Sequence, residues 1–150
     1  MKKNKSKKII GFTCGSFDIT HAGHYLMFQE IKNKCDYLTI GLQSDPSIDR
    51  KEKNKPIQSI KEREIQLKSC KYIDKIIHYK TEKDLIRLLK KLKPDIRFLG
   101  EDWKNKNYTG KNLPIKTIFN SRNHNYSSAN LRKKIIEEYK KIPPISKPTL

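Results

Sequence analysis

The sequence lacks a long hydrophobic run, and this absence excludes two classes of protein. No stretch approaches the roughly 20 apolar residues that a membrane-spanning helix needs. The apolar stretch 9–14, which follows a basic N-terminus, is short and interrupted by Gly11 and Thr13, so it cannot form the core of a signal peptide. We therefore expect a cytoplasmic protein that neither spans a membrane nor carries an export signal.

Cysteine is scarce, and no boundary between domains is visible. The 3 cysteines lie far apart and form no C-x-x-C pair, so we expect neither a disulfide framework nor a structural zinc site. The chain shows no internal repeat and no linker. A length of 150 residues is enough to bury the core of one domain.

Acidic residues are outnumbered, and lysine carries most of the excess positive charge. Lys and Arg total 34 against 16 Asp and Glu, which gives a net charge of +18. Of the basic residues 28 are Lys and 6 are Arg, whereas nucleic-acid readers rely on the planar guanidinium of Arg. A basic protein also attracts phosphorylated metabolites. The charge therefore indicates an acidic partner without choosing between these two kinds.

Strand-like and helix-like segments alternate along the whole chain. The pattern predicts strands at 8–14, 36–42, 73–79, 95–99 and 115–119, with helices at 22–34, from 59, at 81–92 and from 127 or 128 to about 140. The alternation predicts one doubly wound, Rossmann-like α/β domain over 9–140, with a five-stranded parallel sheet and helices on both faces. Residues 1–8 are then a basic N-terminal tail, and 141–150 a proline-containing C-terminal tail.

Local signals mark where individual helices begin and which face they bury. The pairs Ser59/Glu62 and Thr81/Asp84 are capping boxes, because the hydroxyl and the carboxylate can each accept a backbone N–H of the other residue. In the last helix we expect the apolar positions, which recur at helical spacing, to face inward: Leu131, Ile135 and Tyr139.

The junction between the first strand and the first helix has the composition of an anion site. His21 and His24 are three residues apart, so they lie on the same side of the first helical turn. Free N–H groups, the helix dipole and imidazole donors together suit phosphate. Zinc binding with Cys14 is a weaker alternative, because Cys14 lies inside the strand and no fourth ligand is near. Incidental surface histidines are the other alternative, although ligands of doubly wound folds bind at this edge.

Three segments resemble signatures of the cytidylyltransferase-like nucleotidyltransferases. The first is Ser16-Phe17-Asp18-x-x-His21-x-Gly23-His24, which is similar to the family's S/T-F-D-x-x-H-x-G-H. Residues 122–128 look like R-T-E-G-I-S-T of glycerol-3-phosphate cytidylyltransferases, and Gly100-Glu101-Asp102-Trp103 is similar to their G-D-D-W. The resemblance extends over about residues 9–137.

This resemblance implies an activity, a cofactor and an assembly. The reaction is transfer of CMP from CTP to a phosphorylated small alcohol, such as glycerol 3-phosphate, with release of pyrophosphate. Mg²⁺ is expected to accompany the nucleotide, and a homodimer is expected, with no nucleic-acid or membrane partner. Ala22, Glu101 and 123–126 depart from the glycerol-phosphate pattern. An adenylyltransferase acting on a sugar phosphate or another phosphorylated acceptor, a nucleotide-binding regulator and a non-catalytic nucleic-acid-binding module therefore stay as alternatives.

The resemblance also implies residue roles. His21 and His24 are the catalytic residues, which contact the triphosphate. The implied nucleotide-binding residues are Ser16, Phe17, Lys53, Arg63, Gly100, Asp102, Arg122, Ser127 and Ser128. The implied residues for the second substrate are Asp18, Lys51 and Trp103. No protein ligand for a metal is expected.

Several of these residues have a second interpretation. Ser127 and Ser128 can simply cap the last helix, and Trp103 can be a core residue. Arg63 falls on the apolar stripe of its helix. If its guanidinium points inward, it needs a buried partner or a phosphate. Alternatively, the aliphatic part of the side chain packs against the core and the guanidinium reaches water. The sequence does not select the lysine of 51–55 that contacts phosphate.

Overall fold

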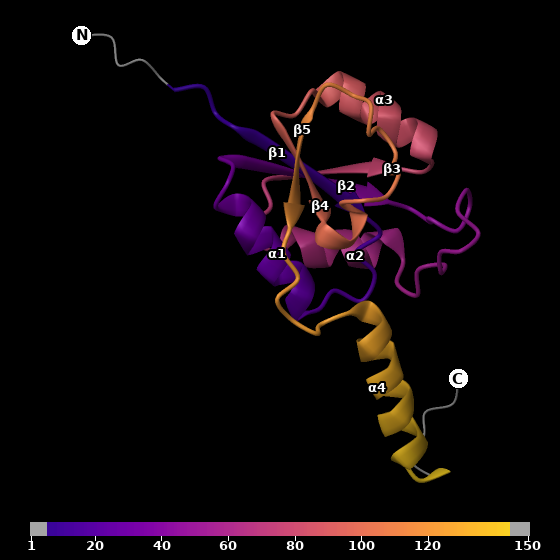
Figure 1. The fold of residues 1–150 in the computed structure, drawn as a ribbon. Coiled ribbons are helices and arrows are strands. Elements are labelled where there is room, and N and C mark those ends of the chain that lie inside the picture. The colour runs from indigo at the N-terminus through magenta and orange to yellow at the C-terminus, as the bar shows by residue number, and fades with distance from the viewer. Residues whose placement is uncertain (1–5, 145–150) are drawn as a thin grey trace.

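A computed structural model describes residues 6–144 and shows a parallel sheet between helices (Figure 1). The strands are β1 (Ile10–Gly15), β2 (Tyr37–Gln43), β3 (Lys75–Tyr79), β4 (Ile96–Gly100) and β5 (Lys116–Asn120). The helices are α1 (Ala22–Lys32), α2 (Ile60–Lys68), α3 (Glu82–Leu92) and α4 (Ser128–Lys141), with a short 3-10 helix, η1 (Glu101–Trp103). The predicted fold class is confirmed.

The order of the strands creates the position of a ligand site. The sheet runs β3-β2-β1-β4-β5 with every pairing parallel. The chain therefore moves outward in one direction from β1 and returns to the other side of β1 at β4. Loops that leave the carboxyl ends of these two neighbouring strands diverge, which leaves a crevice between them.

Apolar side chains fill both faces of the sheet. On one face Phe28 and Ile31 of α1 and Leu67 of α2 pack against the strands, and all three are 0% exposed. On the other face Leu85 and Leu89 of α3 form a second cluster with Phe12 and Tyr79. Burial on both faces explains why the central strands are continuous apolar runs rather than alternating patterns.

The predicted capping boxes are present at the second and third helices. Ser59 and Glu62 exchange hydrogen bonds at the start of α2, and Thr81 and Asp84 do the same at the start of α3. These bonds satisfy backbone donors that the first turn of a helix leaves free. The sequence pattern alone therefore predicts where both helices begin.

Helix α4 differs from the prediction. It has no buried residue, and it projects away from the rest of the chain (Figure 1). Ile135, which was expected to face inward, is 51% exposed, while Leu131 and Tyr139 are half-buried. The prediction for Ile135 is wrong, because helical periodicity indicates an apolar face but not what covers it.

The predicted terminal tails lie largely beyond the described residues. Of the tails at 1–8 and 141–150, the structure describes only residues 6–8 and 141–144. Within residues 6–144 no helix is long and apolar enough to cross a membrane.

Candidate active site

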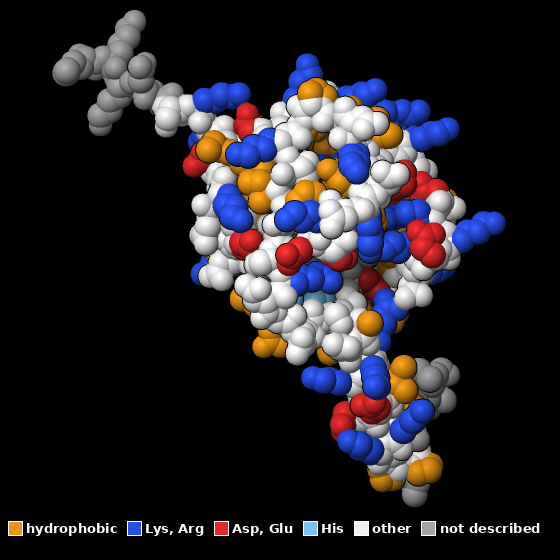
Figure 2. All heavy atoms as spheres, viewed as in Figure 1, with side chains coloured by type: hydrophobic (Ala, Val, Ile, Leu, Met, Phe, Trp, Pro, Cys, Tyr) orange, Lys and Arg blue, Asp and Glu red, His pale blue; other side chains and the backbone are white. Residues whose placement is uncertain are grey.

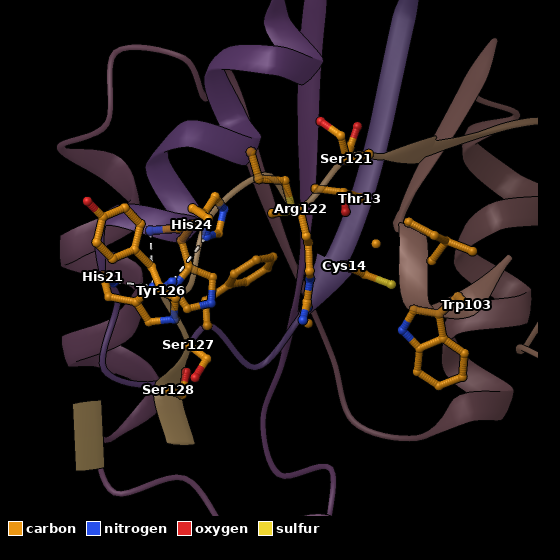
Figure 3. A pocket seen from close by; sticks show the side chains of 18 residues that line it. Thr13, Cys14, His21, His24, Trp103, Ser121, Arg122, Tyr126, Ser127 and Ser128 are labelled. Atoms are coloured by element: carbon orange, nitrogen blue, oxygen red, sulfur yellow. Dashed lines mark hydrogen bonds between the residues drawn. The ribbon is translucent and has the colours of Figure 1, made fainter. Parts of the chain in front are cut away.

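A cavity of about 260 Å³ lies at the carboxyl ends of β1, β4 and β5, beside the first turns of α1 and α4 (Figure 3). It brings together eight of the residues implied by the family resemblance: Phe17, His21, His24, Gly100, Trp103, Arg122, Ser127 and Ser128. Figure 3 shows the two imidazoles and the two serines on one side of the cavity, with Trp103 opposite and Arg122 between them. The first sequence motif therefore lies in the predicted crevice at the carboxyl ends of the strands.

The loop that carries the first motif has a strained backbone. Phe17 and Ile19 adopt left-handed conformations with φ of 48° and 47°, which is unfavourable for L-residues and most of all for a β-branched one. Asp18, 6% exposed, holds the loop in place. Its carboxylate accepts the backbone N–H groups of Ile57 and Gln58 at 2.9 Å each.

Arg132 of α4 completes this anchor. Its guanidinium donates to the Asp18 carboxylate at 2.7 Å, and both side chains are largely shielded from water. Asp18 therefore ties the first loop to the segment before α2 and to the last helix. The resemblance implied that Asp18 binds the second substrate, but in this structure its oxygens are occupied by protein donors.

Both motif histidines have a fixed tautomer. The Nδ1 atom of His21 accepts the backbone N–H of Gly23 at 3.1 Å, and Nδ1 of His24 accepts the backbone N–H of His21 at 3.2 Å. An imidazole whose Nδ1 accepts a hydrogen bond carries its proton on Nε2 when neutral. Each ring thus keeps one N–H donor for a ligand, and the ring centroids are 4.0 Å apart.

The environment keeps these imidazoles neutral. Burial lowers the pKa of His24 to about 4, with smaller effects of the same sign from His21 and Arg122. Burial also lowers the pKa of His21, helped by His124 and Arg122. At neutral pH the two rings therefore act as uncharged hydrogen-bond donors. Neutral donors can bind phosphate oxygens without repelling each other.

A third histidine joins the cavity from the far end of the sequence. His124 lines it, and its Nδ1 accepts the backbone N–H of Tyr126 at 3.2 Å, so it has the same tautomer. A Cβ at Gly23 would lie 2.9 Å from Cε1 of His124 and 3.0 Å from Nδ1 of His21. The absence of a side chain at Gly23 leaves room for the rings of His21 and His124. Sequence analysis missed His124, although it lies inside the 122–128 segment.

Beyond the histidines the cavity is lined by Arg122 and Trp103, whereas Asp102, an implied nucleotide-binding residue, lines none of the described cavities and is connected to the site through Arg122. Arg122 lies 3.6 Å from Asp102, and both are well exposed. A Cβ at Gly100 would lie 2.6 Å from Asp102 Oδ1, so glycine makes room for this pair. Lys53 Nζ lies 5.6 Å from the centre of the Trp103 ring. Trp103 is therefore part of the site rather than a core residue, and Lys53 is the lysine of 51–55 that reaches it.

Helix α4 presents its N-terminus to the cavity. Ser127 Oγ accepts the backbone N–H of Asn130 at 3.0 Å, so the capping interpretation is confirmed. Neither α1 nor α4 has an acidic residue in its first turn, whereas α2 and α3 do. The positive ends of these two helix dipoles are therefore left for an external anion.

Arg63 finds a buried partner, which was one of the environments expected from the sequence. It is 2% exposed and lines none of the described cavities. Its guanidinium donates to backbone carbonyls at the ends of the loops around it: those of Ser16, Gln43, Ser44, Gln58 and Ser59. The alternative in which its head reaches water is wrong. The buried partner is the backbone itself, and Arg63 supports the site by joining three segments.

Two other predicted residues lie at the edge of the site. Ser16 and Lys53 line a hollow of about 200 Å³ that adjoins the main cavity through Phe17, His24 and Ser128. Lys51 is exposed and lines none of the described cavities. Sequence reasoning also missed Asn120, which lines the main cavity and is 2% exposed, with no hydrogen-bond partner for its amide among the described residues.

A larger hollow of about 610 Å³ opens beside the main cavity and shares Cys14, Gly15, Leu99 and Trp103 with it. Arg97 of β4 lines it and is 3% exposed. The Arg97 guanidinium donates to the Thr109 carbonyl, while its Nε has no hydrogen-bond partner among residues 6–144. Two neighbouring cavities at the same strand ends suit two substrates that must react together.

Across residues 6–144, no group of three or more His, Cys, Asp or Glu side chains is placed to hold a metal ion. A divalent ion that enters with a nucleotide needs no such group, because phosphate oxygens can hold it. Triphosphate oxygens are suitable ligands, because Mg²⁺ prefers oxygen and commonly keeps few protein contacts.

Comparison with known proteins agrees with this arrangement. The family model described as "Cytidylyltransferase-like" matches residues 12–146. The chain belongs to the cytidylyltransferase-like family. It is therefore a nucleotidyltransferase, and the resemblance found in the sequence is confirmed.

Curated relatives are longer proteins. The chain is 38% identical over 136 residues to the bifunctional protein HldE of Helicobacter pylori (strain J99), covering 90% of this chain and 29% of that protein. It is also 38% identical over 112 residues to HldE of Campylobacter jejuni (strain RM1221), covering 74% of this chain and 24% of the relative. The chain thus spans less than a third of the length of these relatives.

Solved structures share the fold. A lipopolysaccharide core biosynthesis protein from Thermoplasma volcanium superposes with a TM-score of 0.56 at 24% identity, covering 88% of this chain and 89% of the other. Pantothenate synthetase from Thermus thermophilus gives 0.54 at 11% identity, covering 83% and 64%. At these identities the likeness concerns the fold alone.

Replacing Arg63 tests whether it is a structural residue. Arg63→Met should lower the free energy of unfolding by about 3 kcal/mol, because buried carbonyls lose their donor. The exposed Arg87, which pairs with Asp84 on α3, is the matched control, and Arg87→Met should change stability by less than about 0.5 kcal/mol. Urea unfolding measures both. An Arg63→Met protein of unchanged stability that no longer binds triphosphate would make Arg63 a ligand residue instead.

The lowered pKa of His24 predicts a dependence of stability on pH. The folded state keeps His24 neutral down to about pH 4, whereas an unfolded chain protonates it near its ordinary pKa of about 6.5. The stabilisation is therefore complete above about pH 6.5 and is lost as the pH falls towards 4, by on the order of 3 kcal/mol.

Urea unfolding at pH values from 4 to 7.5 measures this loss. His24→Asn should flatten the profile over that range, because the asparagine that replaces the imidazole does not titrate there. Equal slopes in the wild type and in His24→Asn would contradict the assignment.

Proposed function

We propose that this nucleotidyltransferase transfers a nucleoside monophosphate from a nucleoside triphosphate to the phosphate of a sugar phosphate and releases pyrophosphate. One observation carries the proposal: neutral imidazole donors and two helix N-termini converge on one cavity. In the reaction an oxygen of the acceptor phosphate forms a bond to the α-phosphorus. The bond from that phosphorus to the oxygen bridging to the β-phosphate breaks, and pyrophosphate leaves.

The residues of the cavity suit this chemistry. Charge builds on the phosphoryl oxygens and on the leaving pyrophosphate, so positioned donors and cations supply most of the catalysis. His21 and His24 are the donors, and Arg122, Ser127 and Ser128 hold the outer phosphates, with Phe17 and Gly100 shaping the wall. The acceptor phosphate is already ionised at neutral pH. The reaction therefore needs no strong general base.

The adjoining hollow supports a polyhydroxylated phosphate as second substrate. Lys53, Arg50 and Arg97 supply positive charge around it. The hydroxyl groups of Tyr79 and Thr109 can accept hydrogen bonds from alcohols, whereas the Glu82 carboxylate is already held by Arg50 and Thr109. The free Nε of buried Arg97 is a donor that a phosphate oxygen could satisfy. Trp103 lies between the two cavities and would contact both substrates. These features favour Arg97 and Trp103, rather than Asp18 or Lys51, as acceptor-binding residues.

Two observations favour different nucleotides. The relatives named HldE support ATP with a sugar phosphate, which is the alternative kept open from the sequence. The Gly100–Trp103 segment supports the second candidate, CTP with glycerol 3-phosphate, because Asp102, which lies 3.6 Å from the cavity residue Arg122, could accept a hydrogen bond from the amino group of cytosine. We place ATP first. In either case Mg²⁺ enters with the triphosphate, and a homodimer stays a prediction.

The choice of substrates is tested by pyrophosphate release. ATP and CTP are each paired, with Mg²⁺, with hexose and heptose phosphates and with glycerol 3-phosphate. We expect kcat/KM for ATP with one of the sugar phosphates to exceed that for CTP with glycerol 3-phosphate at least tenfold. The opposite order would favour the second candidate. Nucleotide binding with no pyrophosphate release from any pair would contradict the proposed reaction.

Removal of the imidazole donors tests their catalytic role. His21→Ala and His24→Ala should each lower kcat by about 10²–10⁴-fold, because a donor to the developing charge is lost. The matched control is His78→Ala, a histidine on β3 outside the cavities described here, which should keep wild-type turnover. Circular dichroism checks that each variant is folded. Turnover preserved in both cavity variants would refute the assigned role.

A further inference from the structure

His124 is an imidazole of the main cavity that lies outside the first sequence motif. It lies two residues after Arg122, in the segment that leads into α4, and it lines the cavity. In the pattern R-T-E-G-I-S-T its position is occupied by glutamate. An ionised carboxylate only accepts hydrogen bonds, whereas a neutral imidazole also donates one. This chain therefore has a donor where that pattern has an acceptor.

The donor of the His124 ring is available to a ligand. Its Nδ1 accepts the backbone N–H of Tyr126 at 3.2 Å, so the neutral ring carries its proton on Nε2. Within residues 6–144 this is the one hydrogen bond of the ring. The Tyr126 ring lies 5.2 Å from the His124 ring between centroids, which helps to hold it in place. Figure 3 shows Tyr126 on the side of the cavity that carries the motif histidines and the two serines.

His124 lies beside the motif histidines although it comes from the opposite wall. A Cβ at Gly23 would lie 2.9 Å from Cε1 of His124 and 3.0 Å from Cε1 of His21, so the two rings flank one glycine. In each ring Cε1 is bonded to Nε2, so the two N–H donors are close together. In Figure 2 histidine surface is visible in a recess beside a basic side chain, next to the start of the projecting helix α4.

The outer phosphates of a triphosphate have few strong donors without His124. The Arg122 side chain is 60% exposed and shares its charge with Asp102 at 3.6 Å, and exposed ion-pairing groups contribute little. Ser127 already accepts the N–H of Asn130 as the helix cap. A leaving pyrophosphate gains negative charge during the reaction, so a positioned donor at this place stabilises the transition state more than the bound substrate.

We infer that His124 is a third catalytic residue, which donates a hydrogen bond from Nε2 to the leaving pyrophosphate. As the acceptor phosphate oxygen bonds to the α-phosphorus, the bond to the bridging oxygen breaks and its electron pair stays on that oxygen. Pyrophosphate leaves, and the proton stays on Nε2. His21 and His24 bind from the α1 wall, and His124 binds from the α4 wall. This role rests on the proposed transfer of a nucleoside monophosphate.

Binding of pyrophosphate tests the contact without any turnover. Titration calorimetry with pyrophosphate and Mg²⁺ should show that His124→Ala weakens binding at least about tenfold, because one charge-assisted hydrogen bond is lost. His124→Gln should stay within about threefold of the wild type, because the glutamine amide keeps an N–H donor at a similar reach. The affinity for AMP and for CMP, which lack the outer phosphates, should change less than about twofold in both variants.

Single-turnover rates test the catalytic part of the inference. His124→Ala should slow the transfer step about 10²-fold, with an unchanged KM for the acceptor phosphate, and His124→Gln should recover at least about tenfold of that loss. The matched control is Asn123→Ala, at an exposed neighbour in the same loop that lines none of the described cavities. It should keep wild-type rate and pyrophosphate affinity.

The results separate this role from a structural one and from the reaction itself. The inference is overturned by a wild-type chain that does not bind pyrophosphate, or by equal pyrophosphate affinity in the wild type and His124→Ala. Equal losses of pyrophosphate and AMP affinity, or equally slow Gln and Ala variants, would make His124 a structural residue. An effect on the acceptor KM alone would place it at the other substrate. Absence of pyrophosphate release from the wild type would contradict the proposed function, while the binding comparison would still decide the contact of His124.

Discussion

The buried carboxylate of Asp18 is the interaction on which the site depends. It accepts two backbone N–H groups from the segment before α2 and a guanidinium N–H from Arg132 of α4. The loop it belongs to contains two non-glycine residues in left-handed conformations, which a short loop would not keep without such contacts. Asp18 thus fixes where the first turn of α1 begins, and with it the positions of both motif histidines.

Arg63 is a second buried charge that holds loops of the site, and its sign is opposite to that of Asp18. It donates to backbone carbonyls at the ends of β1 and β2 and before α2, so loops that lie far apart in sequence converge on one guanidinium. Backbone carbonyls that face inward at a strand end would otherwise be unsatisfied. Two buried charges therefore hold the loops of the site, one through N–H groups and one through carbonyls, and neither is free for a ligand.

The proposed phosphate site relies on the orientation of its hydrogen-bond donors rather than on net charge. Although the chain carries +18, the histidines are neutral donors whose tautomers are set by backbone N–H groups. Burial, which lowers their pKa, also strengthens each hydrogen bond they can make. The dipoles of α1 and α4 add positive potential at the same cavity. In a preorganised cavity of this kind the free energy of reorganisation is small when charge develops on a reacting phosphate.

The sequence by itself determined what depends on neighbours within a few residues. It predicted the five strands, the four α-helices and the capping boxes at Ser59 and Thr81, because periodicity and capping act within one helical turn, but it did not predict the short helix η1. Only the tertiary structure decided which distant groups meet: His124 beside Gly23, Arg132 on Asp18, and backbone carbonyls around Arg63. It also left the apolar stripe of α4 uncovered, where sequence had placed Ile135 inside. The partner of a buried charge or an apolar face is fixed by how separate segments pack, and local patterns carry no information about that.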